Sequence, residues 1–319
     1  MRAKSNDTLP IGITLPTELG VERKGMLFAA LGIAAFSLSF PMTRLALDSF
    51  GPTIVGLGRA VVAASVAIVG LVWLRAPLPG RDEWIPLVVV SLGVVIGFPW
   101  LTAYAMRTVP SAHATVIVSL APLATAVVGA VRAGERPSRA FWAAAVAGAL
   151  AVLAFGLTRA EMSLETTDLI LLASVLFVAV GYAEGGRLSR TMGGVRVISW
   201  ALVLALPVTL PMTAYAVAEG EIRPAVEPRA IVGFLYVALV SMYAAYFAWY
   251  RGLATAGIAN ASQVQLLQPV LGLVWAVLLL GESVSFATAL TGLVVVGCAA
   301  WARVAREMPR TLTTVRAEP

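Results

Sequence analysis

The feature that most constrains the fold of this chain is a succession of ten apolar stretches, each about 20 residues long. Each stretch is long enough to cross about 30 Å of hydrocarbon as a helix. Because a backbone in lipid must satisfy its own hydrogen bonds, we expect helices here and not strands. The sequence therefore predicts an all-α polytopic membrane protein with ten transmembrane helices. The stretches cover residues 25–47, 53–74, 84–105, 111–131, 140–158, 168–188, 197–217, 230–250, 258–280 and 285–303.

Composition excludes the other broad classes of protein. Of the 319 residues, 59% are hydrophobic and only 13% are charged, whereas soluble domains carry about 25% charged residues. These values exclude both an ordinary soluble enzyme and a disordered chain. The connections between the stretches are short and leave no room for an extramembrane domain. The polar segments 1–24 and 306–319 are interpreted as cytoplasmic tails.

Residue counts also argue against catalysis and cofactor binding. The only lysines, Lys4 and Lys24, precede the first apolar stretch, so neither a phosphate-binding loop nor a Schiff-base lysine is expected in the membrane. The single histidine, His113, excludes a zinc site of the HExxH type. The single cysteine, Cys298, excludes an intramolecular disulfide. We therefore expect no cofactor, no metal and no nucleic-acid partner, and a membrane-embedded enzyme is the weaker alternative.

Arginine and lysine predict how the chain is oriented in the membrane. With the N-terminus in the cytoplasm, 17 of the 23 basic residues fall in cytoplasmic segments and 5 in outer loops, while Arg59 lies within a span. Basic residues concentrate on the cytoplasmic side of membrane proteins. Both termini are therefore predicted to be cytoplasmic.

The fourth and ninth stretches repeat one pattern with an offset of 147 residues. Further upstream the offset slips to 146, which pairs Trp100 with Tyr246 and Tyr104 with Tyr250. Each half of the chain then contains five spans, and because five is odd the halves must be inverted relative to each other. Inverted repeats are typical of secondary transporters, whose substrate site lies near the midplane between the repeats. The pairs with the longer offset are Ala112 and Ala259, Pro122 and Pro269, Gly134 and Gly281, and Glu135 and Glu282.

The repeated proline and Gly-Glu pattern resembles the EamA family of the drug/metabolite transporter superfamily. The resemblance covers about residues 25–305 and departs from the family at Ser283, where arginine is usual. It implies a first five-helix repeat at 25–160 and a second, inverted one at 165–305, called below the first and second halves. Members are typically exporters of amino acids and other small metabolites in the bacterial inner membrane. Spans one to four and six to nine form their central cavity, and spans five and ten are peripheral.

Aromatic residues are the first candidates for the substrate pathway. Tyr243, Tyr246 and Tyr250 share one face of a helix in span eight, and Trp100 and Tyr104 share one in span three. Their rings can enclose an apolar side chain, and a phenol can bond a carboxylate or an amine. The alternative is that they are packing or interfacial aromatics. Within the family, this aromatic content resembles the YddG-like amino-acid exporters.

Span nine is unusually polar for a membrane helix and supplies the second group of pathway candidates. Ser262, Gln265 and Gln268 belong to it, and Thr115 in span four is added to them. Amides are costly against lipid, so we expect them to face protein or water. They suit a zwitterionic substrate that must also be released. The alternative is hydrogen bonding between helices, a common use of glutamine in membrane bundles.

Prolines within spans and one buried arginine are candidate hinge or gating residues. Pro41, Pro122 and Pro269 each remove a backbone hydrogen bond and can kink a helix, which also frees a carbonyl for a substrate amine. Arg59, in the position of an arginine common in the resembling family, is expected to have a structural or gating role. Asp48 is a possible partner for its charge.

Two further ionisable groups have structural interpretations. Glu184 is expected to form an interfacial salt bridge with Arg187, three residues later on the same helix. His113 is interpreted as a polar residue at a helix end, and the alternative is a proton shuttle.

These observations predict a secondary transporter that exports small metabolites by alternating access. Amino acids, aromatic or otherwise neutral, are the first expectation, and other metabolites or toxic cations are the alternative. Because no Asp or Glu lies near the middle of a span, coupling to protons is expected to be weak or absent. A channel explains the spans but not the inverted repeat. The expected partners are a small-molecule substrate and the lipid bilayer, and monomer and homodimer both remain open.

Overall fold

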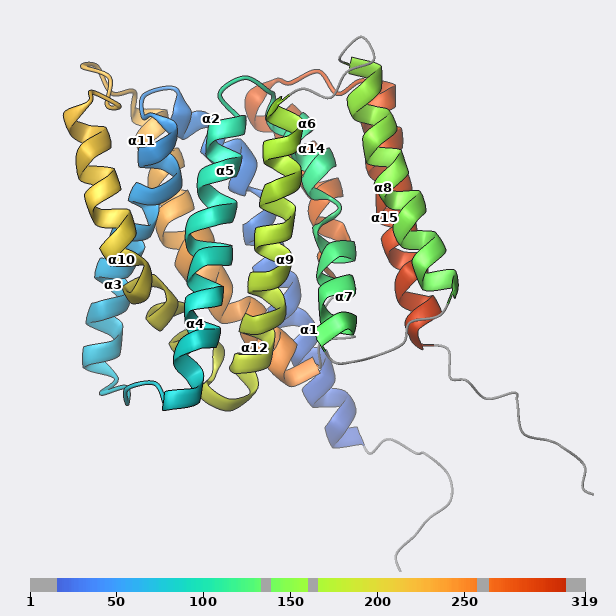
Figure 1. Cartoon of the computed structure of the whole chain (residues 1–319), viewed down its shortest axis with the longest axis horizontal. Helices are drawn as coiled ribbons and strands as arrows, with labels where there is room; N and C mark the ends of the chain where they lie inside the picture. Colours follow the sequence, from blue (N-terminus) through green and yellow to red (C-terminus); the bar gives the residue numbers. More distant parts are fainter. Residues whose placement is uncertain (1–15, 133–138, 160–165, 257–263, 308–319) are drawn as a thin grey trace, which may run out of the picture.

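The computed structural model is a bundle of helices (Figure 1) and describes residues 16–132, 139–159, 166–256 and 264–307. In these ranges the only strand-like pairing is an isolated bridge between Phe50 and Ile222. The α-helices are α1 (Pro16–Ser37), α2 (Ser39–Leu47), α3 (Arg59–Trp73), α4 (Trp84–Val90), α5 (Phe98–Ala105), α6 (Ser111–Val118), α7 (Ala121–Arg132), α8 (Arg139–Arg159), α9 (Thr166–Met192), α10 (Gly194–Ala218), α11 (Pro228–Leu235), α12 (Ala245–Ala256), α14 (Leu267–Leu280) and α15 (Phe286–Glu307).

Shorter helical pieces join some of these helices into continuous rods. Three are π-helices, η1 (Ile54–Gly58), η3 (Ser91–Gly97) and η4 (Tyr236–Ala244), and one is the 3-10 turn η2 (Arg81–Glu83). A π-turn inserts an extra residue into a helix, and such bulges are frequent at functional sites. Thus η1 leads into α3, η3 lies between α4 and α5, and η4 lies between α11 and α12.

Seven helical rods of the described residues are long and apolar enough to cross a membrane, which confirms the all-helical, multi-pass class. Three further apolar helices, Arg139–Ala151, Leu267–Leu280 and Phe286–Cys298, are shorter in their described parts, so the count of ten stays a prediction. The seven are Arg23–Leu47, Ile54–Trp73, Arg81–Ala105, Ser111–Gly129, Thr166–Met192, Gly194–Ala218 and Pro228–Gly252.

The two ends of the bundle differ in what they carry. In Figure 1, α1 begins and α15 ends at the same, lower end, which we call the termini end. The opposite end, called the far end, holds the last turn of α2 and the first turns of α6 and α11. The helices α8 and α15 pack mainly on each other at one edge of the bundle (Figure 1).

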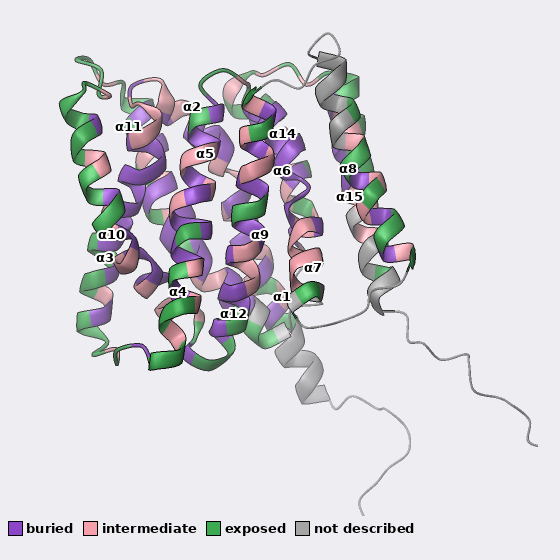
Figure 2. Cartoon of the chain, in the orientation of Figure 1, coloured by how far each residue is buried: buried purple, intermediate pink, exposed green. Residues whose placement is uncertain are grey.

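Close approach of helices is achieved by small residues. A Cβ atom added to Gly93 in η3 would lie 2.6 Å from the Phe177 carbonyl oxygen of α9 and 2.8 Å from the Gly181 Cα. Neither contact tolerates a side chain, so this helix pair depends on glycine on both sides. Purple, buried residues therefore concentrate between the helices in Figure 2, while exposed apolar residues cover the outside.

Three rods are broken at matched distances from prolines. The break between α1 and α2 lies at Leu38, the break between α6 and α7 includes Ser119, and a turn at Leu266 precedes α14. Each of these residues stands three positions before a proline, Pro41, Pro122 or Pro269 respectively. Proline lacks an N–H and its ring clashes with the carbonyl four residues earlier, which is why the helices are interrupted there.

Two carboxylates of the second half cap helices of the first half at the far end. Glu282 accepts hydrogen bonds from the backbone N–H groups of Ser111 and Ala112 at the start of α6, at 2.9 and 2.8 Å. Glu221 accepts those of Thr53 and Ile54 at the start of η1, at 2.9 and 3.2 Å. Helix N-termini leave unsatisfied donors and a positive dipole end, which a carboxylate satisfies.

Candidate functional site

A narrow cavity, which we call the central cavity, lies where the broken helices meet. Its volume is about 30 Å³, room for about two water molecules. It is therefore far smaller than the pockets of 300 Å³ or more that hold small-molecule ligands. The lining residues are Phe36, Ser37, Phe40, Phe98, Thr115, Val118, Ser119, Ala121, Pro122, Val178, Tyr182, Gln265, Gln268, Pro269 and Gly272.

The proline breaks leave backbone carbonyls on residues that line this cavity. The carbonyls that Pro41, Pro122 and Pro269 leave without their usual helical donor belong to the residues four positions earlier. Those residues, Ser37, Val118 and Gln265, all line the cavity. Carbonyl dipoles from broken helices are a recurring way to hold cationic groups inside membrane transporters. The arrangement thus concentrates hydrogen-bond acceptors around one small space.

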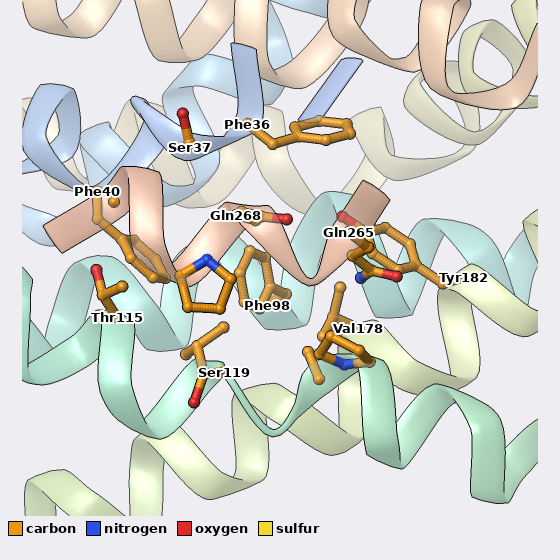
Figure 3. Close-up of a pocket in the computed structure, with 15 residues that line it drawn as sticks. Phe36, Ser37, Phe40, Phe98, Thr115, Ser119, Val178, Tyr182, Gln265 and Gln268 are labelled. Atoms are coloured by element: carbon orange, nitrogen blue, oxygen red, sulfur yellow. The ribbon is translucent and has the colours of Figure 1, made fainter. Parts of the chain in front are cut away.

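Two glutamine amides supply the polar side chains. Gln265 is 4% exposed, Gln268 is half-buried, and both lie beside the cavity (Figure 3). Neither side chain makes a hydrogen bond to any residue that the structure describes. Hydrogen bonding between helices, the alternative for these two glutamines, is therefore not observed within the part of the chain that the structure describes. Buried amides without partners carry a desolvation penalty that a polar substrate or water relieves.

The hydroxyls of the cavity, by contrast, are already engaged. The Thr115 hydroxyl donates to the Ser111 carbonyl at 2.8 Å, and the Ser119 hydroxyl bonds the Val116 carbonyl. The Ser37 hydroxyl donates to the Ala34 carbonyl at 2.7 Å and accepts the indole N–H of Trp275 at 3.0 Å. Thr115 thus lines the cavity, but its donor is used by its own helix.

An aromatic wall closes one side of the cavity, and the predicted Tyr246 lies directly behind it. The ring of Tyr246 packs edge-on against Phe36 at 4.9 Å and against Tyr182 at 6.3 Å between centroids. Phe36 and Tyr182 line the cavity, whereas Tyr246 itself is buried in the second layer. Figure 3 shows Tyr182 beside Gln265, with Phe40 and Thr115 farther along the cavity.

The lining residues that sequence reasoning missed include Phe36, Phe40, Phe98 and Tyr182. The repeat itself carried a signal for some of them. The 146-residue offset relates Phe36 to Tyr182, and the 147-residue offset relates the prolines that flank the cavity. A cavity between two related halves is lined by related positions. Each lining residue in one half therefore indicates the residue at the corresponding position of the other half.

Four predicted aromatic residues lie away from the central cavity. Tyr104 is 47% exposed, with the Arg107 guanidinium 5.5 Å from its ring centre. Tyr243 bonds the Ser199 hydroxyl of α10 at 3.0 Å. Tyr250 is fully buried against glycines of α9 and α10, and Trp100 packs on Gly56 of η1. These placements correspond to the packing alternative weighed for the aromatic residues.

The remaining candidates have mixed placements. Ser262 lies outside the described residues. Pro122 and Pro269 line the cavity, and Pro41 is buried within α2 next to the lining residue Phe40. Arg59, at the start of α3, is buried and forms no ion pair within the described ranges. The pairing with Asp48 that was considered possible is not formed, because Asp48 instead pairs with Arg229 at 3.4 Å.

Two ion pairs connect or stiffen the spans near their ends. Glu184 and Arg187 pair at 3.1 Å, which confirms the predicted salt bridge along α9. His113 in α6 bonds Asp168 in the first turn of α9 at 2.7 Å, and both side chains are buried. Sequence reasoning did not pair these two residues, because their separation of 55 positions crosses two spans.

Similarity to known proteins identifies the class of transporter. The sequence model of the EamA-like transporter family matches the chain twice, over residues 23–157 and 166–302. The chain belongs to the EamA-like transporter family. It is thus a two-repeat member of the drug/metabolite transporter superfamily, a membrane transporter with a small-molecule substrate rather than an enzyme.

The relatives of this EamA-like transporter come from several bacteria. It is 43% identical over 279 residues to "Uncharacterized transporter YdeK" of Bacillus subtilis (strain 168), and the aligned residues cover 88% of this chain and 96% of the relative. It is 24% identical over 268 residues to "Probable terminal-alkyne amino-acid exporter" of Streptantibioticus cattleyicolor, which covers 79% and 84%. A solved structure named "Crystal structure of protein" shares the fold, with a TM-score of 0.61, 19% identity and coverage of 87% and 97%.

This EamA-like transporter also has a wider cavity at its far end, called the polar vestibule, with a volume of about 480 Å³. Three arginines, Arg44, Arg107 and Arg229, and two carboxylates, Asp48 and Glu282, contribute to its lining. The carboxylates are engaged, Asp48 with Arg229 and Glu282 with the start of α6. The vestibule and the central cavity share no lining residue, and the first turn of α6 belongs to the region between them.

Proposed function

We propose that this transporter exports amino acids, aromatic or otherwise neutral, from the cytoplasm by alternating access through the central cavity. The observation that carries the proposal is the convergence of unengaged polar groups on one small buried space. Two glutamine amides without hydrogen-bond partners among the described residues and three residues with proline-freed carbonyls lie there beside aromatic rings. An amino acid presents an amine, a carboxylate and a side chain that match these three kinds of group.

The proposal includes ten spans in two inverted halves, which cross a bacterial inner membrane. The termini end lies on the cytoplasmic side. It is supported by the double family match and by the excess of basic residues predicted for the cytoplasmic side. The far end, with the polar vestibule, is then extracytoplasmic. Because the central cavity has room for only about two water molecules, a substrate requires the halves to move apart. Rocking of one repeat against the other supplies this movement.

Amino acids are favoured over other metabolites by the relative from Streptantibioticus cattleyicolor, whose name describes an amino-acid exporter. The absence of carboxylates among the described lining residues of the central cavity argues against a toxic cation as substrate. Within the proposal, Pro122 and Pro269 act as hinges, and the predicted YddG-like specificity for aromatic substrates corresponds to the wall formed by Phe36 and Tyr182.

The test is transport by the purified protein in liposomes, with a panel of labelled neutral and aromatic amino acids. We expect transport by the wild type and a loss of about tenfold or more in kcat/KM for Gln265→Ala and Gln268→Ala, because each removes polar contacts to a buried substrate. Leu267→Ala is the matched control, since Leu267 lies between the two glutamines and is 54% exposed. Normal transport by both glutamine variants would show that the site is misassigned, and transport of organic cations alone would refute the substrate class.

A further inference from the structure

Arg59 presents an energetic problem that its surroundings do not resolve. It lies inside the membrane-spanning rod Ile54–Trp73 and is 5% exposed. Its Nε atom has no hydrogen-bond partner, and across the described ranges its guanidinium forms no ion pair. A buried charge without a counter-ion is strongly unfavourable, and ionisable residues within membrane spans generally serve substrate or ion pathways.

The charge of Arg59 acts on a residue behind the aromatic wall of the central cavity. The guanidinium lies within electrostatic range of the phenol of Tyr246, which is 4% exposed. The Tyr246 hydroxyl in turn interacts with that of Tyr182, whose ring lies 6.3 Å away between centroids. Tyr182 is a lining residue. A continuous series of polar groups therefore leads from the buried cation to the cavity surface.

The chemistry of these groups favours one direction for their hydroxyl hydrogens. A guanidinium has donors only, and its charge attracts the phenol oxygen of Tyr246 and repels the hydroxyl hydrogen. The Tyr246 hydroxyl is thereby oriented to donate toward Tyr182. The Tyr182 oxygen then acts as the acceptor, which leaves its own O–H free to donate toward the cavity. The cavity wall thus presents a hydrogen-bond donor with a positive charge behind it.

We propose that Arg59 makes the central cavity selective for substrates that carry a carboxylate, with the Tyr246 and Tyr182 phenols as relay between the guanidinium and the substrate. This inference rests on the proposed transport function and adds the substrate group that is recognised. Arg59 is a positioning residue, and Tyr182 is the residue that contacts the carboxylate. The amine of a zwitterionic substrate is left for the acceptors at the proline breaks, around Val118 and Gln265.

The polar vestibule supports the same selectivity at the other end of the path. Arg229 in its lining is paired with Asp48 and Glu227, and Glu282 is engaged by the start of α6. Arg44 and Arg107, which also line it, form no ion pair among the described residues. A cleft lined by an excess of one charge concentrates ions of the opposite charge. A substrate group that is negative is therefore favoured from the central cavity to the far end.

The experiment compares an amino acid with its own amide, leucine with leucinamide and phenylalanine with phenylalaninamide, in liposomes that contain the purified protein. The amide keeps the amine and the side chain and lacks the carboxylate. We expect wild-type kcat/KM to favour the acid. Arg59→Gln should lower the ratio of kcat/KM for the acid to kcat/KM for the amide by about tenfold, through a raised KM for the acid. This is the scale of a lost charge-assisted hydrogen bond. Arg59→Lys, which keeps the charge, should retain most of the preference.

Tyr182→Phe is the second variant, because it removes the donor at the cavity and leaves the buried cation in place. It should lower the same ratio with little effect on transport of the amide, and it keeps the inference testable should Arg59→Gln fail to fold. Equal loss of acid and amide transport in both variants would overturn the inference, since a merely structural role has that result. If the wild type transports acid and amide equally, this inference fails and the proposed function stands. If it transports no member of the amino-acid panel, both fail.

Discussion

The carboxylate of Glu282 holds the first turn of the helix that begins at Ser111. The Ser111 backbone N–H donates to Oε1 of Glu282, and the nitrogen and oxygen are 2.9 Å apart. Glu282 follows Gly281, which has a φ of +64° and ends α14 in the left-handed conformation that favours glycine. The Gly-Glu pair of the repeat thus ends one helix and caps another that belongs to the other half. This contact joins the two halves beside the polar vestibule.

Removal of this cap should weaken the junction of the halves. We expect Glu282→Ala to lower the free energy of unfolding by about 1–2 kcal/mol, as for other lost N-caps, because two N–H groups lose their acceptor. Thermal unfolding in detergent measures the effect. Glu83→Ala is the matched control, since Glu83 accepts the backbone N–H of Gly80 within its own exposed turn at 2.7 Å. An equal effect of the two substitutions contradicts a role in joining the halves.

The buried pair of His113 and Asp168 should make a larger contribution to stability. We expect His113→Ala to lower the free energy of unfolding by about 3 kcal/mol, because the Asp168 carboxylate stays buried after its partner is removed. A double-mutant cycle with Asp168→Asn should then show that the two effects are not additive. Additive effects in the cycle would mean that the 2.7 Å contact contributes no coupling between α6 and α9.

Replacement of the cavity prolines should stabilise the protein and slow transport. In Pro122→Ala and Pro269→Ala a backbone N–H becomes available to the carbonyl of Val118 or Gln265, so the helix can close over its break. We expect a higher unfolding temperature together with a several-fold lower kcat. Pro207→Ala is the control, because Pro207 lies within α10, is exposed and does not line the cavity. Unchanged kcat in both cavity variants would rule out hinges at these prolines.

Proton coupling should be weak. Among the described lining residues the central cavity has no carboxylate and no histidine, so protonation has no group there through which to change substrate binding. We expect a pH gradient imposed across the liposome membrane to stimulate amino-acid transport only slightly. Stimulation of about tenfold or more by the gradient alone would contradict this expectation and would direct attention to His113 and Asp168 as the proton-binding pair.

The helical architecture could be predicted from sequence because length and hydropathy decide it. A stretch of about 20 apolar residues has few alternatives to a helix in lipid, and the helices are interrupted just before Pro122 and Pro269, as the loss of a backbone N–H there predicts. The glutamines could be predicted as well, because an amide in a span must face protein or water. Both kinds of inference follow from the local chemistry of one segment.

The identity of the lining aromatic residues could not be predicted in the same way. Helical periodicity shows that Tyr243 and Tyr246 share a face, but it does not show what that face contacts. In the structure Tyr243 bonds Ser199 of α10, and Tyr246 packs behind Phe36. The partner depends on how helices distant in sequence are arranged. The pairing of His113 with Asp168 was missed for the same reason.

The small volume of the central cavity has a consequence for the cell. A file of water molecules across a bilayer core of about 30 Å requires many more positions than two, so a space of about 30 Å³ cannot serve as a standing conduit. In this conformation the central cavity therefore offers ions and protons no continuous passage, and we expect space for passage to be created only while a substrate is being moved.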